Sequence, residues 1–321
     1  MGSEKRFKKG PKYERASSRV KRPVETNVPV TFPLPEDTRR HLGSVRQTII
    51  PRTANLFLLF NKLPMCWVKK DNMWDTELKL DRKKINLKSK FLEEIEEEQN
   101  SLKQHAEKYL NAIRVRYERL IKNFQDRDYK VKLFSLTTDY RLILGLGGTS
   151  VLETGFTLHP LYGFPYIPAS SLKGVARAYA EIVEDASKDL IQEIFGSEVK
   201  DRILETNRQG KVVFLDGIPI KFPKLEVDIM NPHYGSYYQG NEPPADYLSP
   251  NPINFLTIAP GTTFSFALFS KEETLTRKAE KWLKGGLKEL GAGGKTNSGY
   301  GYFNERHPYL YHRDKPFYKH Q

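Results

Sequence analysis

The chain has 321 residues, of which 52 are Lys or Arg and 39 are Asp or Glu, so its formal net charge is +13. This length suffices for one large domain or two small ones, and the charge favours polyanionic partners, nucleic acid first among them. No apolar run approaches the roughly 18 residues of a membrane-spanning helix, and the single cysteine, Cys66, excludes an internal disulfide and a cysteine-rich zinc site. Because the first residues are polar and basic, without the apolar segment of a secretory signal, we expect a soluble cytoplasmic protein.

Residues 1–50 are predicted to form a basic flexible arm. They contain twelve Lys and Arg against five Asp and Glu, together with five prolines. A segment of this composition buries too little apolar surface to offset the entropy that it loses on ordering. We expect a polyanion to order this arm; the alternative is a tail that only aids solubility. Residues 306–321 are predicted to be a C-terminal tail.

Residues 51–129 are predicted to be a helical extension of the main domain. Short apolar runs before residue 80 are expected to pack on that domain. From Lys88 to about Asp128, apolar residues recur at steps of three, four or seven, which predicts one long helix. At about 1.5 Å per residue this helix would be on the order of 60 Å long, and it would either lie across the body or meet another subunit.

Residues 130–305 have the pattern of an α+β domain, in which strands alternate with amphipathic helices. In chain order we expect strands within 130–144, a helix at 170–183, a short helix at 189–195, strands at 212–215 and 225–229, a hairpin of 255–258 with 263–269, a helix at 271–290, and a last strand.

A long segment, residues 230–252, separates the expected strands of the second half. It is rich in Asn, Pro, Gly and Tyr, and it carries Tyr234, Tyr237 and Tyr238 together with His233. Loops of this length in a compact body are often functional. Its aromatic side chains predict a surface that could stack nucleic-acid bases.

The start of the helix at 170–183 combines groups that suit a phosphate. Ser170 or Ser171 is predicted to cap the free N–H groups of the first turn, and Lys173 and Arg177 follow four residues apart on one face. A helix N-terminus itself favours anions. The other reading is an ordinary capped amphipathic helix whose Lys and Arg side chains are solvated.

A glycine-rich loop, residues 291–301, precedes the last strand. It matches neither the P-loop nor the dinucleotide-binding fingerprint, because its glycine spacing and its helix-to-strand order are wrong for both. Its glycines allow close backbone approach, and Lys295, Thr296, Asn297 and Ser298 supply donors that suit a polynucleotide backbone. The other reading is a simple turn between helix and strand.

The sequence gives little support for catalysis. The seven histidines show no metal-ligand spacing, and we expect neither a metal nor another cofactor. His159, near Ser150, could act in acid–base cleavage of RNA, and Asp139 could assist a metal-dependent cut. Both stand alone, and a lone histidine or aspartate in a loop is usually structural.

Three stretches together carry a family resemblance. They are Gly147-Gly-Thr-Ser150, the run Ile167-Pro-Ala-Ser-Ser-Leu-Lys-Gly174 that opens a helix, and the loop Gly291-Ala-Gly-Gly-Lys-Thr-Asn-Ser-Gly-Tyr-Gly301. In this order, around a β-rich middle, they resemble the RAMP superfamily of CRISPR RNA-binding proteins over residues 130–305. The first two look more narrowly like the family that supplies the sixth Cmr subunit of type III-B effector complexes.

The resemblance implies a ferredoxin-like (RRM-like) RAMP core, β-α-β-β-α-β with an antiparallel sheet, to which a long N-terminal helix and inserted loops are added. It also implies which residues would line the RNA side. Carried over by motif, these are Gly147, Gly148, Thr149, Ser150, Ser170, Ser171, Lys173, Arg177, Gly293, Gly294, Lys295, Thr296, Asn297 and Ser298.

The resemblance further implies a non-catalytic subunit that caps the backbone filament of a Cmr ribonucleoprotein near the 3′ part of the CRISPR RNA. Such a subunit supports target RNA cleavage by the complex in antiviral defence. Its partners would be CRISPR RNA, target RNA, the repeated backbone RAMP subunit, the small helical subunit and the first Cmr subunit, with no membrane partner.

Two other functions remain open from the sequence. One is a RAMP-type endoribonuclease that processes CRISPR RNA, with His159 as acid or base. The other is an interaction subunit that docks through the long helix and makes no direct contact with RNA.

Overall fold

The structure is a computed structural model, and it describes residues 35–38, 40, 55–64, 66–70, 73–80, 83–197, 209–231, 240, 243 and 252–305. Most of the predicted basic arm, the tyrosines of the 230–252 segment and the predicted tail at 306–321 lie outside the described residues. Within the described part, none of the helices has both the length and the apolar character needed to cross a membrane.

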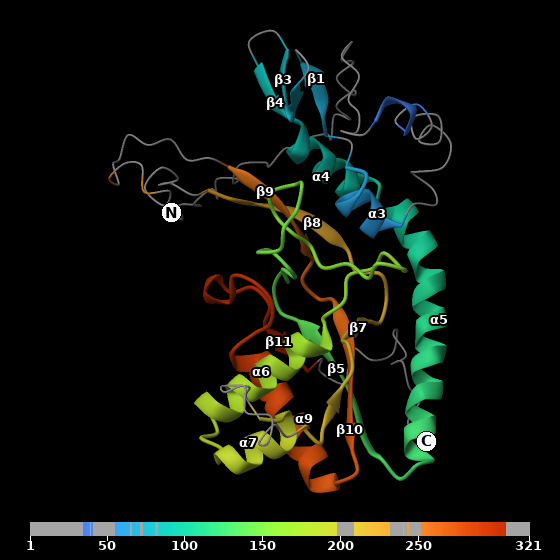
Figure 1. The fold of residues 1–321 in the computed structure, drawn as a ribbon, viewed down its shortest axis with the longest axis vertical. Helices are drawn as coiled ribbons and strands as arrows, with labels where there is room; N and C mark the ends of the chain where they lie inside the picture. The colour runs from blue at the N-terminus through green and yellow to red at the C-terminus, as the bar shows by residue number, and fades with distance from the viewer. Residues whose placement is uncertain are drawn as a thin grey trace, which may run out of the picture.

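A five-stranded antiparallel sheet forms the centre of the molecule (Figure 1). Strand β5 (Lys130–Thr138) pairs with β10 (Thr263–Ser270) over eight residue pairs, from Lys130 opposite Ser270 to Thr137 opposite Thr263. Strand β11 (Phe303–Asn304) pairs with the other edge of β5. The outer edge of β10 pairs with two short strands, β6 (Val213–Phe214) and β7 (Ile218–Pro219).

Two helices, α6 (Ala169–Ile182) and α9 (Glu273–Glu289), cover one face of this sheet, and α7 (Lys188–Phe195) packs beside α6. Lys132 of β5 pairs with Glu273 of α9 at 2.7 Å. Helices α6 and α9 run antiparallel, because Val175 in the middle of α6 lies beside Gly286 late in α9, while Glu184 just after α6 pairs with Lys281, earlier in α9. The start of α6 and the loop that leaves α9 therefore lie at the same end of the helix pair.

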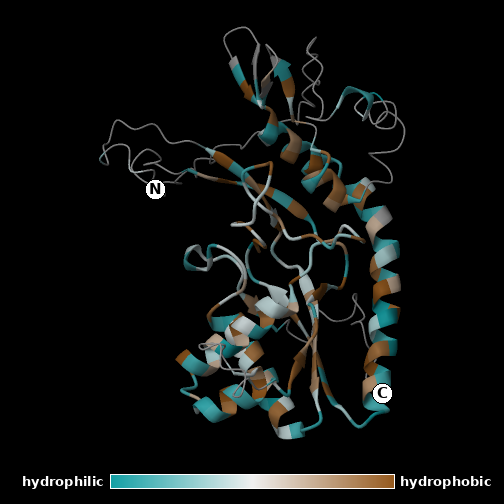
Figure 2. Cartoon of the chain, in the orientation of Figure 1, coloured by the Kyte–Doolittle hydropathy of each residue, from teal (hydrophilic) through white to brown (hydrophobic). Residues whose placement is uncertain are grey.

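The long helix predicted at 88–128 is not one continuous helix. It is found as α4 (Leu87–Glu97) and α5 (Gln99–Gln125), and Glu98 between them has a non-helical ψ of 6°. The predicted apolar stripe of α5 is buried only in part: Leu102, Ala106, Leu110, Ile113 and Ile121 are buried, whereas Tyr109, Val115 and Leu120 are exposed. Figure 2 shows hydrophobic and hydrophilic segments alternating along this helix.

Helix α5 packs along the body on the sheet face opposite α9. Neighbouring residues of a strand point to opposite faces, and Val131 is next to Lys132, whose side chain faces α9. Phe269, the cross-strand partner of Val131, has its ring 4.0 Å from that of Phe124 at the end of α5. Every residue of β10 from Phe264 to Ser270 is buried, so this strand offers no exposed ring on either face.

A second antiparallel pair, β8 (Leu225–Met230) and β9 (Ile253–Ile258), leaves the central sheet and contacts α4 (Figure 1). The predicted hairpin of 255–258 with 263–269 is therefore wrong. Both strands form, but β9 pairs with β8, and β10 pairs with β5. Between β9 and β10 the chain turns onto the end of β5. There Gly261 N donates to Thr138 O, and Thr138 N donates to Thr262 O.

The remaining elements of the N-terminal half are short. Helix α3 (Leu56–Asn61) is capped by the Asn55 side chain, which accepts from Phe57 N at 2.8 Å. Two small hairpins follow, β1 (Val68–Lys70) with β2 (Met73–Asp75) and β3 (Glu77–Leu80) with β4 (Lys83–Asn86). A single apolar cluster runs from Leu56 and Phe60 of α3 through the sheet to α9.

The contact between α6 and α9 requires a glycine at 286. A Cβ there would lie 2.9 Å from the carbonyl oxygen of Val175, so Gly286→Ala should lower the free energy of unfolding by about 1–3 kcal/mol through overpacking. Gly174, exposed in α6, would meet nothing within 4 Å. Gly174→Ala should instead raise stability by about 0.5–1 kcal/mol through helix propensity. Denaturant unfolding measures the free energy of unfolding of both variants. An equal change in Gly286→Ala and Gly174→Ala would contradict the close contact between α6 and α9.

Candidate nucleic-acid interface

The start of α6 is capped by a carboxylate rather than by its own serines. Ala169 N donates to Asp216 Oδ1 at 2.7 Å, and the N-cap residue is Pro168, whose side chain has no acceptor. Ser170 and Ser171 lie one and two residues inside the helix, so their predicted role as cap is wrong. Both serines are exposed. The Asp216 carboxylate occupies part of the anion-favouring helix end.

The two cations of the α6 start have different surroundings. Arg177 Nε donates to Glu181 Oε1 at 2.7 Å, in an i,i+4 pair that offsets much of its charge locally. Lys173 is half-buried and has no ion pair with any described residue. Of the predicted phosphate seat, the structure thus leaves Lys173 and the two serine hydroxyls available.

The glycine-rich loop packs its backbone directly on the segment that follows β5. Gly294 N donates to Ile143 O at 2.9 Å, and Gly301 N donates to Arg141 O at 2.9 Å. A Cβ at Gly293 would lie 2.0 Å from Ile143 O, and one at Gly301 would lie 1.9 Å from Ala292 O. The close approach predicted from the glycines is present, and its partner at these two positions is protein backbone.

The outer part of this loop holds the exposed donors. Thr296–Ser298 form a single 3-10 turn, η2, and Asn297, Ser298 and Gly299 are exposed. Lys295 enters the turn with a left-handed φ of +58°, and its Nζ lies 5.3 Å from the centre of the Phe255 ring. This contact directs the lysine while leaving it half-exposed.

The loop at Gly147–Ser150 adjoins the glycine-rich loop. It continues the chain from Leu146, whose Cβ lies 3.4 Å from where a Cβ of Gly294 would be. Gly148 N closes a turn onto Gly145 O, and Ser150 Oγ accepts from Leu152 N at 3.1 Å. The structure therefore brings together two of the three predicted groups, the Gly147–Ser150 loop and the glycine-rich loop. The third group, the start of α6, lies at the same end of the α6–α9 helix pair as the glycine-rich loop.

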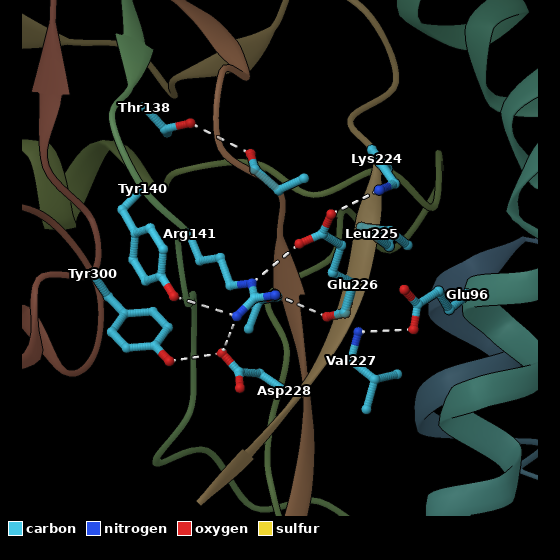
Figure 3. A network of polar contacts seen from close by, with 12 residues as sticks. Glu96, Thr138, Tyr140, Arg141, Lys224, Leu225, Glu226, Val227, Asp228 and Tyr300 are labelled. Atoms are coloured by element: carbon cyan, nitrogen blue, oxygen red, sulfur yellow. Dashed lines mark hydrogen bonds and ion pairs between the residues drawn. The ribbon is translucent and has the colours of Figure 1, made fainter. Parts of the chain in front are cut away.

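A polar network that the sequence reading missed anchors this region (Figure 3). Arg141, just after β5, donates through Nε to Glu226 at 3.1 Å and through Nη1 to Asp228 at 2.8 Å. Tyr300 of the glycine-rich loop donates its hydroxyl to Asp228 at 2.7 Å, and Lys224 pairs with Glu226 at 2.7 Å. The network joins β8, the end of β5 and the loop.

The electrostatics of the network are consistent with charged carboxylates and a neutral tyrosine. The hydrogen bond from Lys224, with that from Arg141, lowers the pKa of Glu226. Burial opposes ionisation of Asp228, but the bonds from Tyr300, the Ile229 backbone and Arg141 outweigh it and lower the pKa of Asp228. Burial and the bond to Asp228 raise the pKa of Tyr300 to about 12.

One signal for this network was present in the sequence. Glu226 and Asp228 are two residues apart in a predicted strand, so their side chains share one face. Two partly buried carboxylates on one face of a strand favour a cationic partner, and Arg141, itself partly buried, pairs with both.

His159 and Asp139, the two residues considered for catalysis, both have structural surroundings. The His159 ring lies 4.4 Å from Tyr162 and 5.5 Å from Tyr166, and its Nδ1 accepts from Leu161 N at 3.3 Å. Burial lowers the pKa of His159, against an opposing effect of Asp216. Asp139 accepts a hydrogen bond from Asn304 Nδ2. Among the described residues, no three His, Cys, Asp or Glu side chains are grouped closely enough to hold a metal ion.

The Tyr300–Asp228 bond gives a stability prediction with a defined pH dependence. Tyr300→Phe should cost about 1.5–3 kcal/mol at pH 7, the range for a hydrogen bond to a charged group. Because the pKa of Asp228 is lowered in the folded state, this contribution is present above the unfolded pKa and is lost on acidification through the folded pKa. Denaturant unfolding at pH 7 and at a series of pH values well below 3.8, the ordinary pKa of an aspartate, should therefore show a difference that shrinks as the pH falls.

Tyr302→Phe is the matched control, since the Tyr302 hydroxyl has no hydrogen-bond partner in the described part of the chain. A Tyr300→Phe variant as stable as Tyr302→Phe at pH 7 would show that the network does not hold the loop.

Comparison with known proteins gives consistent matches. Residues 135–304 match the family model of the RAMP superfamily. The chain is 34% identical to the CRISPR system Cmr subunit Cmr6 of Pyrococcus furiosus, over 78% of this chain and 94% of that protein. It is 31% identical to the Cmr6 subunit of Saccharolobus solfataricus over 45% of this chain and 48% of that protein. A cryo-EM structure of the type III-B Cmr-beta complex bound to cognate target RNA contains a chain that aligns with a TM-score of 0.50 and 25% identity, over 67% of this chain and 75% of that one.

Proposed function

We propose a function for this chain from its family: it belongs to the RAMP superfamily and is a homologue of Cmr6. The proposed function is that of a non-catalytic RNA-binding subunit of a cytoplasmic type III-B CRISPR (Cmr) ribonucleoprotein. In this role it caps the backbone filament near the 3′ part of the CRISPR RNA and supports target RNA cleavage by the complex. Its protein partners are the repeated backbone RAMP subunit, the small helical subunit and the first Cmr subunit. The identity to Cmr6 over nearly that protein's whole length supports this assignment.

The observation that carries the RNA-binding proposal is the shared location of the predicted groups. The glycine-rich loop packs on the Arg141–Ile143 segment, and the Gly147–Ser150 loop continues from it. Lys173, at the start of α6, has no ion pair with a described residue, and Lys295 is half-exposed with its Nζ 5.3 Å from the centre of the Phe255 ring. Two lysines, exposed hydroxyls and the exposed Asn297 amide at one end of a protein of charge +13 suit an RNA backbone.

The topology supports a ferredoxin-like core for this proposal. The order β11-β5-β10-β6, with α6 between β5 and β6 and α9 between β10 and β11, is that of a β-α-β-β-α-β unit. In RRM proteins the open sheet face stacks bases. Here α5 packs on that side and β10 is buried, so we assign RNA contact to the loops at the end of the sheet.

The surroundings of the two catalytic candidates support a non-catalytic role. A general base needs an accessible lone pair near the substrate, but Nδ1 of His159 is occupied by Leu161 N, and three aromatic rings surround the imidazole. No specific observation favours the endoribonuclease reading over the binding reading.

The test is binding of single-stranded CRISPR RNA by the full chain across a salt series, with product analysis of the same samples. Lys173→Ala and Lys295→Ala should each weaken binding by up to about tenfold, which is ~1.4 kcal/mol, and each should reduce the salt slope by about 1. Lys211→Ala removes the same charge from a lysine that is paired with Glu193 and Glu272, and it should have little effect.

Three results would contradict the proposal. Equal losses in all three lysine variants would mean that net charge, not this site, sets the affinity. RNA cleavage that is abolished by His159→Ala would identify a nuclease. Failure of the wild-type chain to bind RNA at low salt would favour an interaction subunit without direct RNA contact.

A further inference from the structure

Two of the described tyrosines are among the largely exposed hydrophobic residues, and one of them, Tyr140, lies beside the glycine-rich loop. Tyr140 follows β5 and is 42% exposed. The chain on either side of it is tied to the exit of the loop, because Asp139 N donates to Tyr302 O and Gly301 N donates to Arg141 O, each at 2.9 Å. An exposed ring is thus fixed next to the exposed donors of the loop.

The Tyr140 ring contacts two side chains that are themselves held by hydrogen bonds to Asp228. The ring of Tyr300 lies 5.4 Å from that of Tyr140 at 70°, an edge-to-face contact, and the Arg141 guanidinium carbon lies 5.7 Å from its centre. Asp228 binds both Tyr300 and Arg141, as Figure 3 shows. A large aromatic surface held in place loses little conformational freedom when it binds a ligand.

The surroundings of Tyr140 favour a role in binding a ligand over a role in packing the protein. Its hydroxyl has one weak contact, to Arg141 Nη1 at 3.4 Å, so hydrogen bonding does not account for an exposed tyrosine here. The cationic Arg141 on one side and the exposed Asn297 and Ser298 side chains of the neighbouring loop favour a flat, electron-rich partner that carries phosphate. An unpaired nucleobase with its own backbone has this chemistry.

We propose that Tyr140 is a stacking platform for one unpaired base of the RNA whose backbone contacts the glycine-rich loop. This inference rests on the proposed RNA-binding function and adds a residue to that site. The platform is tolerant of sequence, because every base has a π face. Tyr300 and Arg141 are positioning residues, since they act by fixing the Tyr140 ring.

The test uses the full chain and single-stranded RNAs with 2-aminopurine placed at one position at a time along the sequence. With wild-type protein, the fluorescence of at least one position should be quenched by stacking on Tyr140. Tyr140→Phe should keep the quenching and bind within about twofold of wild type. Tyr140→Leu should lose the quenching and bind about 5- to 150-fold more weakly, the range for loss of one stacked base, with an unchanged salt slope.

The chain supplies a matched control in Tyr109 of α5, which is 38% exposed and packs against Tyr162, away from the loops. Tyr109→Leu should bind RNA as the wild type does. The unfolding midpoints of the variants show whether a loss of binding reflects a loss of fold.

The outcomes separate this inference from the function on which it rests. Unchanged affinity and quenching in a folded Tyr140→Leu variant would overturn the platform and leave the phosphate contacts standing. Equal losses in Tyr140→Phe and Tyr140→Leu would overturn it as well, since the hydroxyl would then be the group that matters. If the wild-type chain does not bind RNA, both the platform and the proposed function fail.

Discussion

The close packing of the glycine-rich loop on the backbone after β5 is the constraint on which the rest of this end of the molecule depends. Carbonyl oxygens stand where a Cβ of Gly293 or Gly301 would be, so no other residue fits at either position without displacing backbone. The packed loop places Tyr300 on Asp228, and Arg141 then links Asp228 and Glu226 of β8 to the end of β5. Loop, central sheet and β8–β9 pair are in this way held as one unit.

This arrangement changes how the helix start can contribute. A free helix N-terminus attracts anions, but Asp216 already accepts from Ala169 at the start of α6. The helix dipole is thus partly offset before any ligand arrives, and a phosphate near α6 would depend on Lys173 and the serine hydroxyls. Electrostatic attraction at this end comes from side chains more than from the helix itself.

Local signals in the sequence predicted most of the helices and strands, but they did not predict which strands pair or which residues cap the helices. The starts and ends of α7, α9 and β10 were predicted to within two residues, because apolar periodicity and Gly or Pro boundaries are local. The pairing of β9 was wrong: a Pro-Gly turn predicts a hairpin, whereas the hydrogen bonds of Thr138 and Thr262 carry the chain onto β5. The cap of α6 comes from Asp216, 47 residues from Ala169. Glu96 and Gln99, on either side of the break at Glu98, accept hydrogen bonds from the backbone of Val227 and Leu225 in β8. Both features depend on contacts between residues far apart in the chain. The predicted site residues remain proposals, although the structure places two of their three groups together.

Hydrogen exchange of the full chain with and without single-stranded CRISPR RNA tests the central claim most directly, since it reports on each segment without substitution. RNA held at this end of the sheet should slow exchange in residues 145–150 and 293–301, while amides of α7, on the other end of the helix pair, exchange at an unchanged rate. Protection confined to α5 or to α7, with no change in the two loops, would contradict the account.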